Sequence, residues 1–515
     1  MVRSSQDSST PGHLRSGGRK GADNADNTAG EPSNRRWWVL VVIGLAQLMV
    51  VLDATIVNIA LPSAQKSLGF SDGNRQWIIT AYALAFGSLL LFGGRLADLI
   101  GRKTTFLVGL VGFAFASAVG GAAPSFEVLV TARAAQGAFG AILAPAALSL
   151  LTTTFTDARE RAKAFGIYGA IAGAGAAVGL LLGGILTEYL DWRWCLYVNL
   201  IFAAIAFVGG WRLLRPGAPP DRTSLDVPGT VIVSAGLFCI VYGFSNAQRH
   251  SWTTPSTWGF LLAGVVLLIT FVLWQQRARH PLLPMRVVSD RDRGASFLAM
   301  FLSGAGMFGV FLFLTYYMQR TLLYSPIKTG LAFLPLVAVL VVASVVAQNS
   351  LVPRIGAKPI VPTGMLFAGG AMAWLTGLNA HSTYVAHIMP PLMLLGLGLG
   401  LVFATSMNLA TAGVRPNDAG VASAMVNTSQ QVGGSVGTSL LNSLATTAAT
   451  SYLVGKRPTP AVVSQAQLHS YTVAYWWSAA FFAVGCVITF LLFRAGPPRA
   501  IQAAAKSEEP APAPV

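Results

Sequence analysis

Residues 38–60 read WVLVVIGLAQLMVVLDATIVNIA. A helix needs about 20 predominantly apolar residues to cross the hydrocarbon core of a membrane, and this run is long enough. It holds one ionisable side chain, Asp53, and it is too long for the apolar part of a signal peptide. The stretch therefore predicts a retained membrane-spanning helix that carries a carboxylate within the membrane.

The same pattern recurs along the chain and predicts an all-α membrane protein with fourteen transmembrane helices. Of the 515 residues, 54% are hydrophobic and only 10% are charged. Soluble proteins carry about 25% charged residues, so most of this surface is expected to face lipid. The predicted spans lie near 38–60, 77–93, 105–123, 128–152, 164–187, 195–214, 228–246, 257–275, 295–318, 328–350, 359–379, 386–410, 420–446 and 473–494.

The net charge of +16 indicates membrane topology and not a nucleic-acid partner. The basic residues are scattered in short loops between apolar runs, which is typical of cytoplasmic loops. With both termini in the cytoplasm, most Lys and Arg fall on the cytoplasmic side. We therefore expect a multi-pass protein of the cell membrane, with disordered cytoplasmic tails at 1–36 and 495–515.

A weak internal repeat predicts two six-helix bundles. Gly101-Arg102-Lys103 and Gly356-Ala357-Lys358 follow the first helix of each bundle at similar distances. Such repeats are common in secondary transporters. The predicted units are a bundle at 37–214, a linker with two extra transmembrane helices at 215–294, and a second bundle at 295–494.

Two charged residues fall inside predicted spans, Asp53 and Arg133. Charge within a membrane costs several kcal/mol, so each residue is a candidate for function. Desolvation raises the pKa of a carboxyl group and a nearby cation lowers it, so a carboxyl group under both influences can take up and release a proton. The pair therefore predicts proton coupling. The alternatives are that Asp53 anchors helix packing and that the Arg133 side chain snorkels toward the membrane interface.

Two further segments are candidates for conformational change. In the loop at 94–103, Gly94, Asp98, Gly101, Arg102 and Lys103 are candidates for a cytoplasmic latch, although basic residues there also serve topology. In the fifth predicted span, glycines spaced by four allow close helix contact, either as static packing or as a sliding seam. These seam residues are Gly175, Gly179, Gly183 and Gly184.

Polar and aromatic residues within the spans are candidates to line a substrate cavity, although amides also serve as interhelical contacts in lipid. They are Asn58, Tyr82, Gln136, Tyr317, Asn408, Asn427 and Gln431. The three cysteines, Cys195, Cys239 and Cys486, are dispersed and are expected to be packing residues. The sequence predicts no metal site and no cofactor, and the proton gradient is the expected energy source.

Several segments together resemble the major facilitator superfamily and, within it, the fourteen-helix drug:proton antiporter branch. Gly94–Lys103 resembles the signature loop between helices 2 and 3, and Arg133–Ala141 resembles the helix 4 motif. Leu52–Pro62 resembles the helix 1 motif of the branch, and Asp191–Trp194 with Asn199 resembles the segment that enters helix 6. The helix 13 segment of the branch is resembled by Asn427, Gln431, Gly433 and Gly434.

The resemblance implies two bundles that rock about a central site. It also implies that Asp53 and Arg133 act in proton coupling, and that Asp98 with its basic neighbours stabilises the outward-facing state. One departure is that Gly179-Leu180 stands where the antiporter motif of helix 5 usually has Gly-Pro.

The sequence thus predicts a proton-coupled exporter of structurally diverse organic compounds, such as antibiotics or other toxic amphiphiles, that acts as a monomer on lipophilic small molecules. An alternative is a dedicated exporter or importer of one metabolite. A membrane-embedded enzyme is disfavoured because none of the six His residues pairs with another at ligand spacing within a span. A channel is disfavoured because no filter-like loop is visible.

Overall fold

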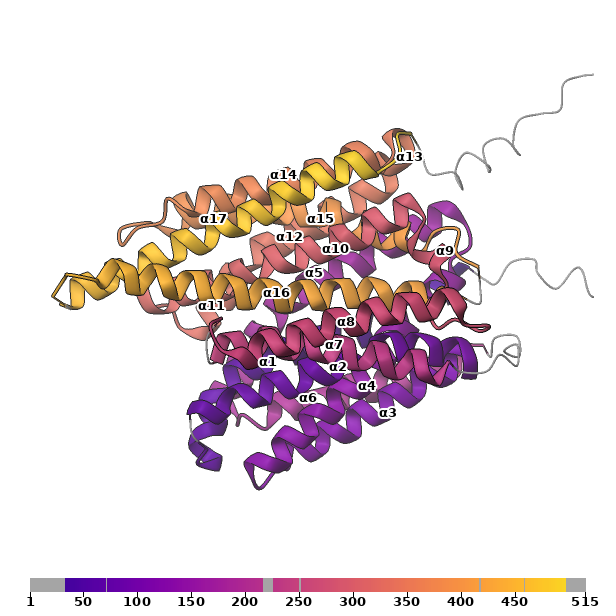
Figure 1. Ribbon diagram of the computed structural model, residues 1–515, viewed down its shortest axis with the longest axis horizontal. Coiled ribbons are helices and arrows are strands. Elements are labelled where there is room, and N and C mark those ends of the chain that lie inside the picture. The colour runs from indigo at the N-terminus through magenta and orange to yellow at the C-terminus, as the bar shows by residue number, and fades with distance from the viewer. Residues whose placement is uncertain are drawn as a thin grey trace, which may run out of the picture.

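The computed structural model describes residues 33–70, 72–215, 226–249, 252–415, 418–457 and 459–496. Over these ranges the chain forms seventeen α-helices and four π-helical segments (Figure 1). The first eight helices are α1 (Ser33–Leu68), α2 (Asp72–Ile100), α3 (Arg102–Gly121), α4 (Phe126–Thr154), α5 (Ala158–Tyr189), α6 (Trp194–Leu213), α7 (Val227–Arg249) and α8 (Pro255–Arg277).

Several of the later helices are continued or interrupted by π-helical turns. A short helix, α9 (Met285–Val288), precedes them. The remaining elements are α10 (Arg291–Gly309), η2 (Val310–Leu314), η3 (Tyr317–Thr321), α11 (Pro326–Ala332), α12 (Leu334–Val346), η4 (Ala347–Leu351), α13 (Val352–Ile355), α14 (Ala357–Leu375), η5 (Tyr384–Ile388), α15 (Met389–Thr411), α16 (Ala419–Leu453) and α17 (Pro460–Leu492).

Among the described residues, 11 helical segments have the length and apolar composition to cross a membrane. These segments include α1 to α4, α6 to α8, α17, and the composite helices built around α10, α12 and α15. The predicted all-α membrane fold is therefore confirmed. Three further long helices, α5, α14 and α16, are not among the 11.

The helix boundaries differ from the prediction at both ends of the described chain. α1 begins at Ser33, inside the range 1–36 that was expected to be a tail. Arg36 Nη1 donates to Glu160 Oε2 at 2.9 Å and fixes this first turn to α5. α16 continues past the predicted end at 446 to Leu453, and α17 begins at Pro460, before the predicted start at 473. The two helices pack against each other.

The two halves of the predicted repeat share an unusual backbone geometry. Gly101 precedes α3 with φ of 92°, and Gly356 precedes α14 with φ of 76°. Residues other than glycine are strained in this region of φ. The short motifs that the sequence pairs therefore mark equivalent sharp turns between antiparallel helices.

Successive long helices run in opposite directions, so their ends gather at two opposite ends of the molecule. One end, which we call the terminal side, holds the start of α1, the end of α17, and α13. The opposite end, where α16 joins α17, is the distal side (Figure 1). Gly101, Asp157, Gly356 and Asp418 precede helices that start on the terminal side.

The early and late helices form two groups that touch at two places. In the first group, α1 packs against α5 and α6, and α4 packs against α2 and α3. In the second, α15 packs against α12 and α14, and α16 packs against α10 and α17. On one side α5 contacts α12 and α15, and on the other α2 and α4 contact α16. The α7–α8 hairpin lies against α2 and α16 through α7.

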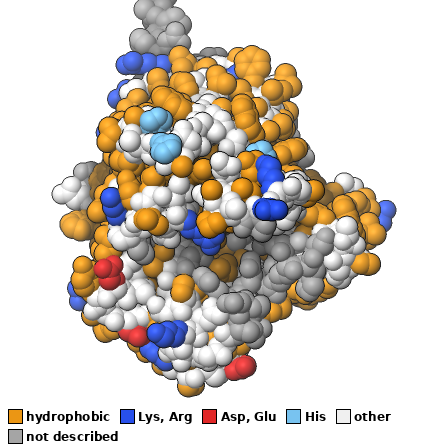
Figure 2. All heavy atoms as spheres, turned by 90° about the vertical axis from the view of Figure 1, so that its left-hand side faces the viewer, with side chains coloured by type: hydrophobic (Ala, Val, Ile, Leu, Met, Phe, Trp, Pro, Cys, Tyr) orange, Lys and Arg blue, Asp and Glu red, His pale blue; other side chains and the backbone are white. Residues whose placement is uncertain are grey.

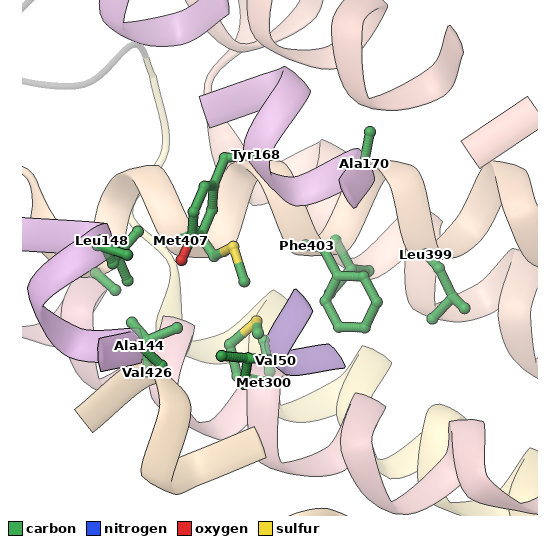
Figure 3. Packing of buried hydrophobic residues seen from close by; sticks show 14 of the residues in the cluster. Val50, Ala144, Leu148, Tyr168, Ala170, Met300, Leu399, Phe403, Met407 and Val426 are labelled. Atoms are coloured by element: carbon green, nitrogen blue, oxygen red, sulfur yellow. The ribbon is translucent and has the colours of Figure 1, made fainter. Parts of the chain in front are cut away.

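One large hydrophobic cluster runs through both groups. Figure 3 shows Val50, Tyr168 and Ala170 of early helices beside Met300, Phe403 and Met407 of late ones. The outer surface is also apolar, with Phe115 70% and Leu262 66% exposed. From the distal side, hydrophobic side chains cover the flanks and charged side chains are scattered (Figure 2). Such a surface suits lipid.

Candidate functional site

Asp53 of α1 lies in the interior of the first helix group and is fully buried. Its Oδ2 accepts a hydrogen bond from Arg133 Nη1 of α4 at 2.6 Å. Its Oδ1 accepts from Asn199 Nδ2 of α6 at 2.7 Å and from Gln136 Nε2 of α4 at 3.0 Å. Both carboxylate oxygens are therefore held by donors from two other helices.

Arg133 points inward toward this carboxylate and is only 1% exposed. Its Nη1 also donates to Gln136 Oε1 at 2.9 Å, and its Nε donates to the Ile78 carbonyl at 3.4 Å. The guanidinium carbon lies 4.4 Å from the ring centre of Tyr82, which is a cation–π contact. The alternative in which Arg133 snorkels to the membrane interface does not agree with this geometry.

Ser117 of α3 and Asn199 complete the cluster, and sequence reasoning did not include them among the site residues. Ser117 Oγ accepts from Gln136 Nε2 at 2.7 Å and from Asn199 Nδ2 at 3.4 Å. Asn199 was noted only as part of the resemblance in helix 6. A lone amide in the apolar run of α6 is a signal that could have found it, because a buried amide needs partners. Ser117 carries no comparable signal.

The chemistry of this cluster depends on whether the Asp53 carboxylate is ionised or protonated. A buried carboxylate is tolerated only when it is paired and hydrogen-bonded, as Asp53 is here. Protonation removes its charge and with it the main attraction for Arg133, which remains charged. Protonation of Asp53 would therefore weaken the hold of this carboxyl group on Arg133.

The other predicted cavity residues are not brought together. Tyr82 and Gln136 join the Asp53 cluster, but Tyr317 donates its hydroxyl to the Asn379 carbonyl at 2.7 Å. Asn427 Nδ2 donates to the Ser423 carbonyl of its own helix at 2.9 Å.

The two remaining cavity candidates with described side chains have different neighbours. Gln431 lies close to Gly87 of α2, and Asn408 donates to Gln348 Oε1 at 2.9 Å. The side chain of Asn58 falls outside the described residues.

The predicted latch residues reach the second helix group through Asp98. Its Oδ1 accepts from the backbone N–H of Gly420 of α16 at 3.1 Å, and Arg102 Nη2 lies 3.8 Å from the same oxygen. Gly94 packs so closely on the Gly420 carbonyl that a Cβ would clash. Lys103 instead donates to the Trp211 carbonyl of α6 at 2.9 Å, within the first group.

Three of the four predicted seam glycines of α5 face α1 next to Asp53. Space for a Cβ is taken by Val51 at Gly175, by Thr55 at Gly179, and by Ile56 at Gly183. Gly184 is also buried. The seam therefore brings α5 close to the helix that carries the carboxylate.

Comparison with known proteins identifies the family. Residues 43–438 match the Major Facilitator Superfamily. A puromycin resistance protein of Streptomyces alboniger is 49% identical over 463 residues, covering 90% of this chain and 92% of that protein. A cephamycin export protein of Amycolatopsis lactamdurans is 39% identical over 405 residues, covering 78% of this chain and 83% of that protein.

A solved structure shows the same fold. The human organic anion transporter MFSD10 superposes with a TM-score of 0.61 over 89% of this chain and 100% of that chain. At 15% identity this likeness concerns the fold alone. The chain therefore belongs to the major facilitator superfamily and is a multi-pass membrane transporter, not an enzyme.

Proposed function

We propose that the protein is a proton-coupled exporter of antibiotics or similar lipophilic organic compounds. The observation that carries the proposal is the buried Asp53–Arg133 pair, at 2.6 Å, inside a transporter fold. The names of the relatives support the substrate class, since they describe resistance to puromycin and export of cephamycin. The energy source is the proton gradient, and the transporter acts as a monomer.

The proposed topology has fourteen spans. It adds α5, α14 and α16 to the 11 segments with membrane length and composition. All three are long and pack between those segments. The spans form two six-helix bundles, α1–α6 and α10–α17, with α7 and α8 between them. The terminal side is cytoplasmic, because the basic loops of the chain fall there.

In the proposed cycle, a proton from outside binds Asp53 and releases Arg133. Release loosens the packing of α1 against α4 and α6, and the bundles rock to open the terminal side. Substrate then enters as the proton leaves to the cytoplasm. One proton moving down one pH unit and 100 mV supplies about 1.4 plus 2.3 kcal/mol. That supports roughly a 500-fold gradient of a neutral substrate.

The test is proton-driven uptake of puromycin into everted membrane vesicles. We expect Asp53→Asn to abolish uptake driven by a pH gradient, because Asn cannot carry a proton between the two sides. The matched control is Glu188→Gln, which removes an exposed carboxylate at the distal end of α5. If Asp53→Asn retains gradient-driven uptake, Asp53 is not the coupling residue.

A second candidate is an exporter dedicated to one compound. It is favoured by the relatives named for single compounds, including a tetracenomycin C resistance and export protein of Streptomyces glaucescens. The same vesicles decide between the two with a panel of unrelated dyes and antibiotics. Transport of one chemical class alone would establish the dedicated exporter.

A further inference from the structure

Arg161 connects the two helix groups at a place separate from the Asp98 contact. It lies in the first turn of α5, on the terminal side. Its Nε donates to Asn408 Oδ1 at 3.3 Å, and its Nη2 donates to Thr411 Oγ1 at 3.2 Å. Both acceptors belong to α15, so the guanidinium bridges the early and late helices.

The acceptors on α15 are also held in position by bonds that do not involve Arg161. Asn408 uses its amide N–H to donate to Gln348 Oε1 at 2.9 Å, which turns its oxygen toward Arg161. Gln348 in turn donates to Thr405 Oγ1 at 3.2 Å, and both side chains are fully buried. Thr411 donates its own proton to the Met407 carbonyl at 3.0 Å, which leaves its oxygen free to accept.

The bridge differs from an ion pair because both acceptors of Arg161 are neutral. Among the described residues Arg161 pairs with no carboxylate, and its other contact is the Phe165 ring, 5.4 Å away. Charged donors form stronger hydrogen bonds than neutral ones, so the bridge favours closure. When the groups separate, water can hydrate the guanidinium, and opening leaves no unpaired charge buried.

The two contacts lie on different helix pairs of the interface between the groups. Asp98 joins α2 to α16, and Arg161 joins α5 to α15. A single contact would let the groups pivot about it, whereas two contacts on separate helices oppose opening across the terminal side.

We propose that Arg161 is a positioning residue that holds the terminal side closed by bridging α5 to α15, in addition to the Asp98 contact. The proposal rests on the alternating-access part of the proposed function. It requires neither proton coupling nor a particular substrate, so it can fail or succeed independently of the Asp53 test.

The measurement is the distance between the two groups on the terminal side. Spin labels are placed at Arg212, at the end of α6, and at Arg415, after α15, because both side chains are exposed. The background carries Cys195→Ala, Cys239→Ala and Cys486→Ala. Pulsed EPR on the purified full-length protein, without substrate or gradient, gives the populations of closed and open forms.

We expect Arg161→Gln to raise the ratio of open to closed forms about tenfold or more, as expected for loss of a charged hydrogen bond. Arg161→Lys retains a donor and should give a smaller shift. Arg159→Gln removes the same charge from an exposed position two residues away and should leave the distribution unchanged. Size-exclusion chromatography confirms that each variant is folded.

A second variant tests the partner. Asn408→Ala should raise the open population on its own, and it should add little when combined with Arg161→Gln, because both remove the same bond. An unchanged distance distribution in Arg161→Gln, or an equal shift in Arg159→Gln, overturns the proposal.

Discussion

At the scale of single residues, the cost of burial explains why the Asp53 cluster is so fully bonded. Taking a carboxylate and a guanidinium out of water costs several kcal/mol per ion. The hydrogen bonds that Asp53 accepts from Arg133, Gln136 and Asn199 offset this cost. Removing one partner of such a pair costs about 3–5 kcal/mol, since the other charge remains buried. In the proposed mechanism a proton on Asp53 leaves the buried Arg133 charge without its partner, so protonation favours a rearrangement that brings Arg133 into contact with water.

We predict that Arg133→Lys reduces gradient-driven uptake by at least about tenfold, although it keeps the charge. The planar guanidinium reaches Asp53, Gln136 and the Ile78 carbonyl together, which a lysine ammonium cannot reproduce. The measurement is vesicle uptake normalised to the amount of folded protein. Uptake near that of the wild type would mean that only the positive charge matters at this position.

At the scale of helices, the seam between α1 and α5 sets how closely α5 approaches the carboxylate. Gly175, Gly179 and Gly183 leave room for Val51, Thr55 and Ile56. Without a hydrophobic driving force between helices in lipid, such close packing is a main source of association. Leu180 stands where the antiporter motif that the sequence resembles usually has Pro, and α5 is continuous from Ala158 to Tyr189.

We predict that Gly179→Ala destabilises the protein by about 1–3 kcal/mol through overpacking. The added Cβ would meet Thr55 Oγ1 and the Leu52 carbonyl. Thermal unfolding in detergent measures the effect, and Thr55→Ala should partly restore the stability of Gly179→Ala. Gly370→Ala is the matched control, because its nearest neighbour is 3.9 Å away. Equal melting temperatures for Gly179→Ala and the wild type would argue against a tight seam.

The α7–α8 hairpin has a titratable contact at its base. Asp226 Oδ1 accepts from Trp274 Nε1 at 3.0 Å and from the Gly229 N–H at 2.9 Å, and Oδ2 accepts from Gln275 Nε2 at 2.7 Å. Burial raises the pKa of Asp226, but these hydrogen bonds outweigh burial and hold the pKa below its ordinary value. A lowered pKa contributes stability above the ordinary pKa and loses it as the pH falls through the folded pKa.

We therefore predict that Asp226→Asn lowers the stability of the protein by about 1.5–3 kcal/mol at pH 7. The difference from the wild type should shrink below about pH 4, where the wild-type carboxylate itself becomes protonated. Melting curves of both proteins across this pH range measure it. A difference that stays constant down to low pH would exclude titration of Asp226 as its cause.

At the scale of the whole molecule, the interface between the helix groups combines apolar packing with a few polar bridges. Buried residues of α1, α4 and α5 pack with those of α10, α15 and α16 in one cluster (Figure 3). On the terminal side, Asp98 and Arg161 add bonds between the groups. The arrangement agrees with a state that is closed on the terminal side.

We predict that topology reporters find both chain ends in the cytoplasm. A periplasmic alkaline phosphatase should be active when inserted after Gly455, in the turn between α16 and α17, and inactive when fused at the C-terminus. A fluorescent protein that folds only in the cytoplasm should give the opposite result. Signals of the same kind at both positions would mean that α17 does not span the membrane.

The helical spans could be predicted from the sequence because membrane insertion depends on local composition. The apolar run around Asp53 and the similar apolar runs along the chain are enough to predict membrane-spanning helices. The residue pair Asp53 and Arg133 could also be selected, because a charge in an apolar run stands out without any structure. The predicted seam faces α1, although nothing in the glycine spacing identified the partner helix.

What only the tertiary structure decided is which side chains meet. Ser117 and Asn199 join Asp53, and Arg161 meets Asn408, across separations of up to 247 positions. Tyr317, Asn427 and Asn408, chosen as one kind of cavity residue, lie in separate environments. The physical reason is that hydropathy is a local property of the chain, whereas each contact depends on the rotation and packing of helices distant in sequence.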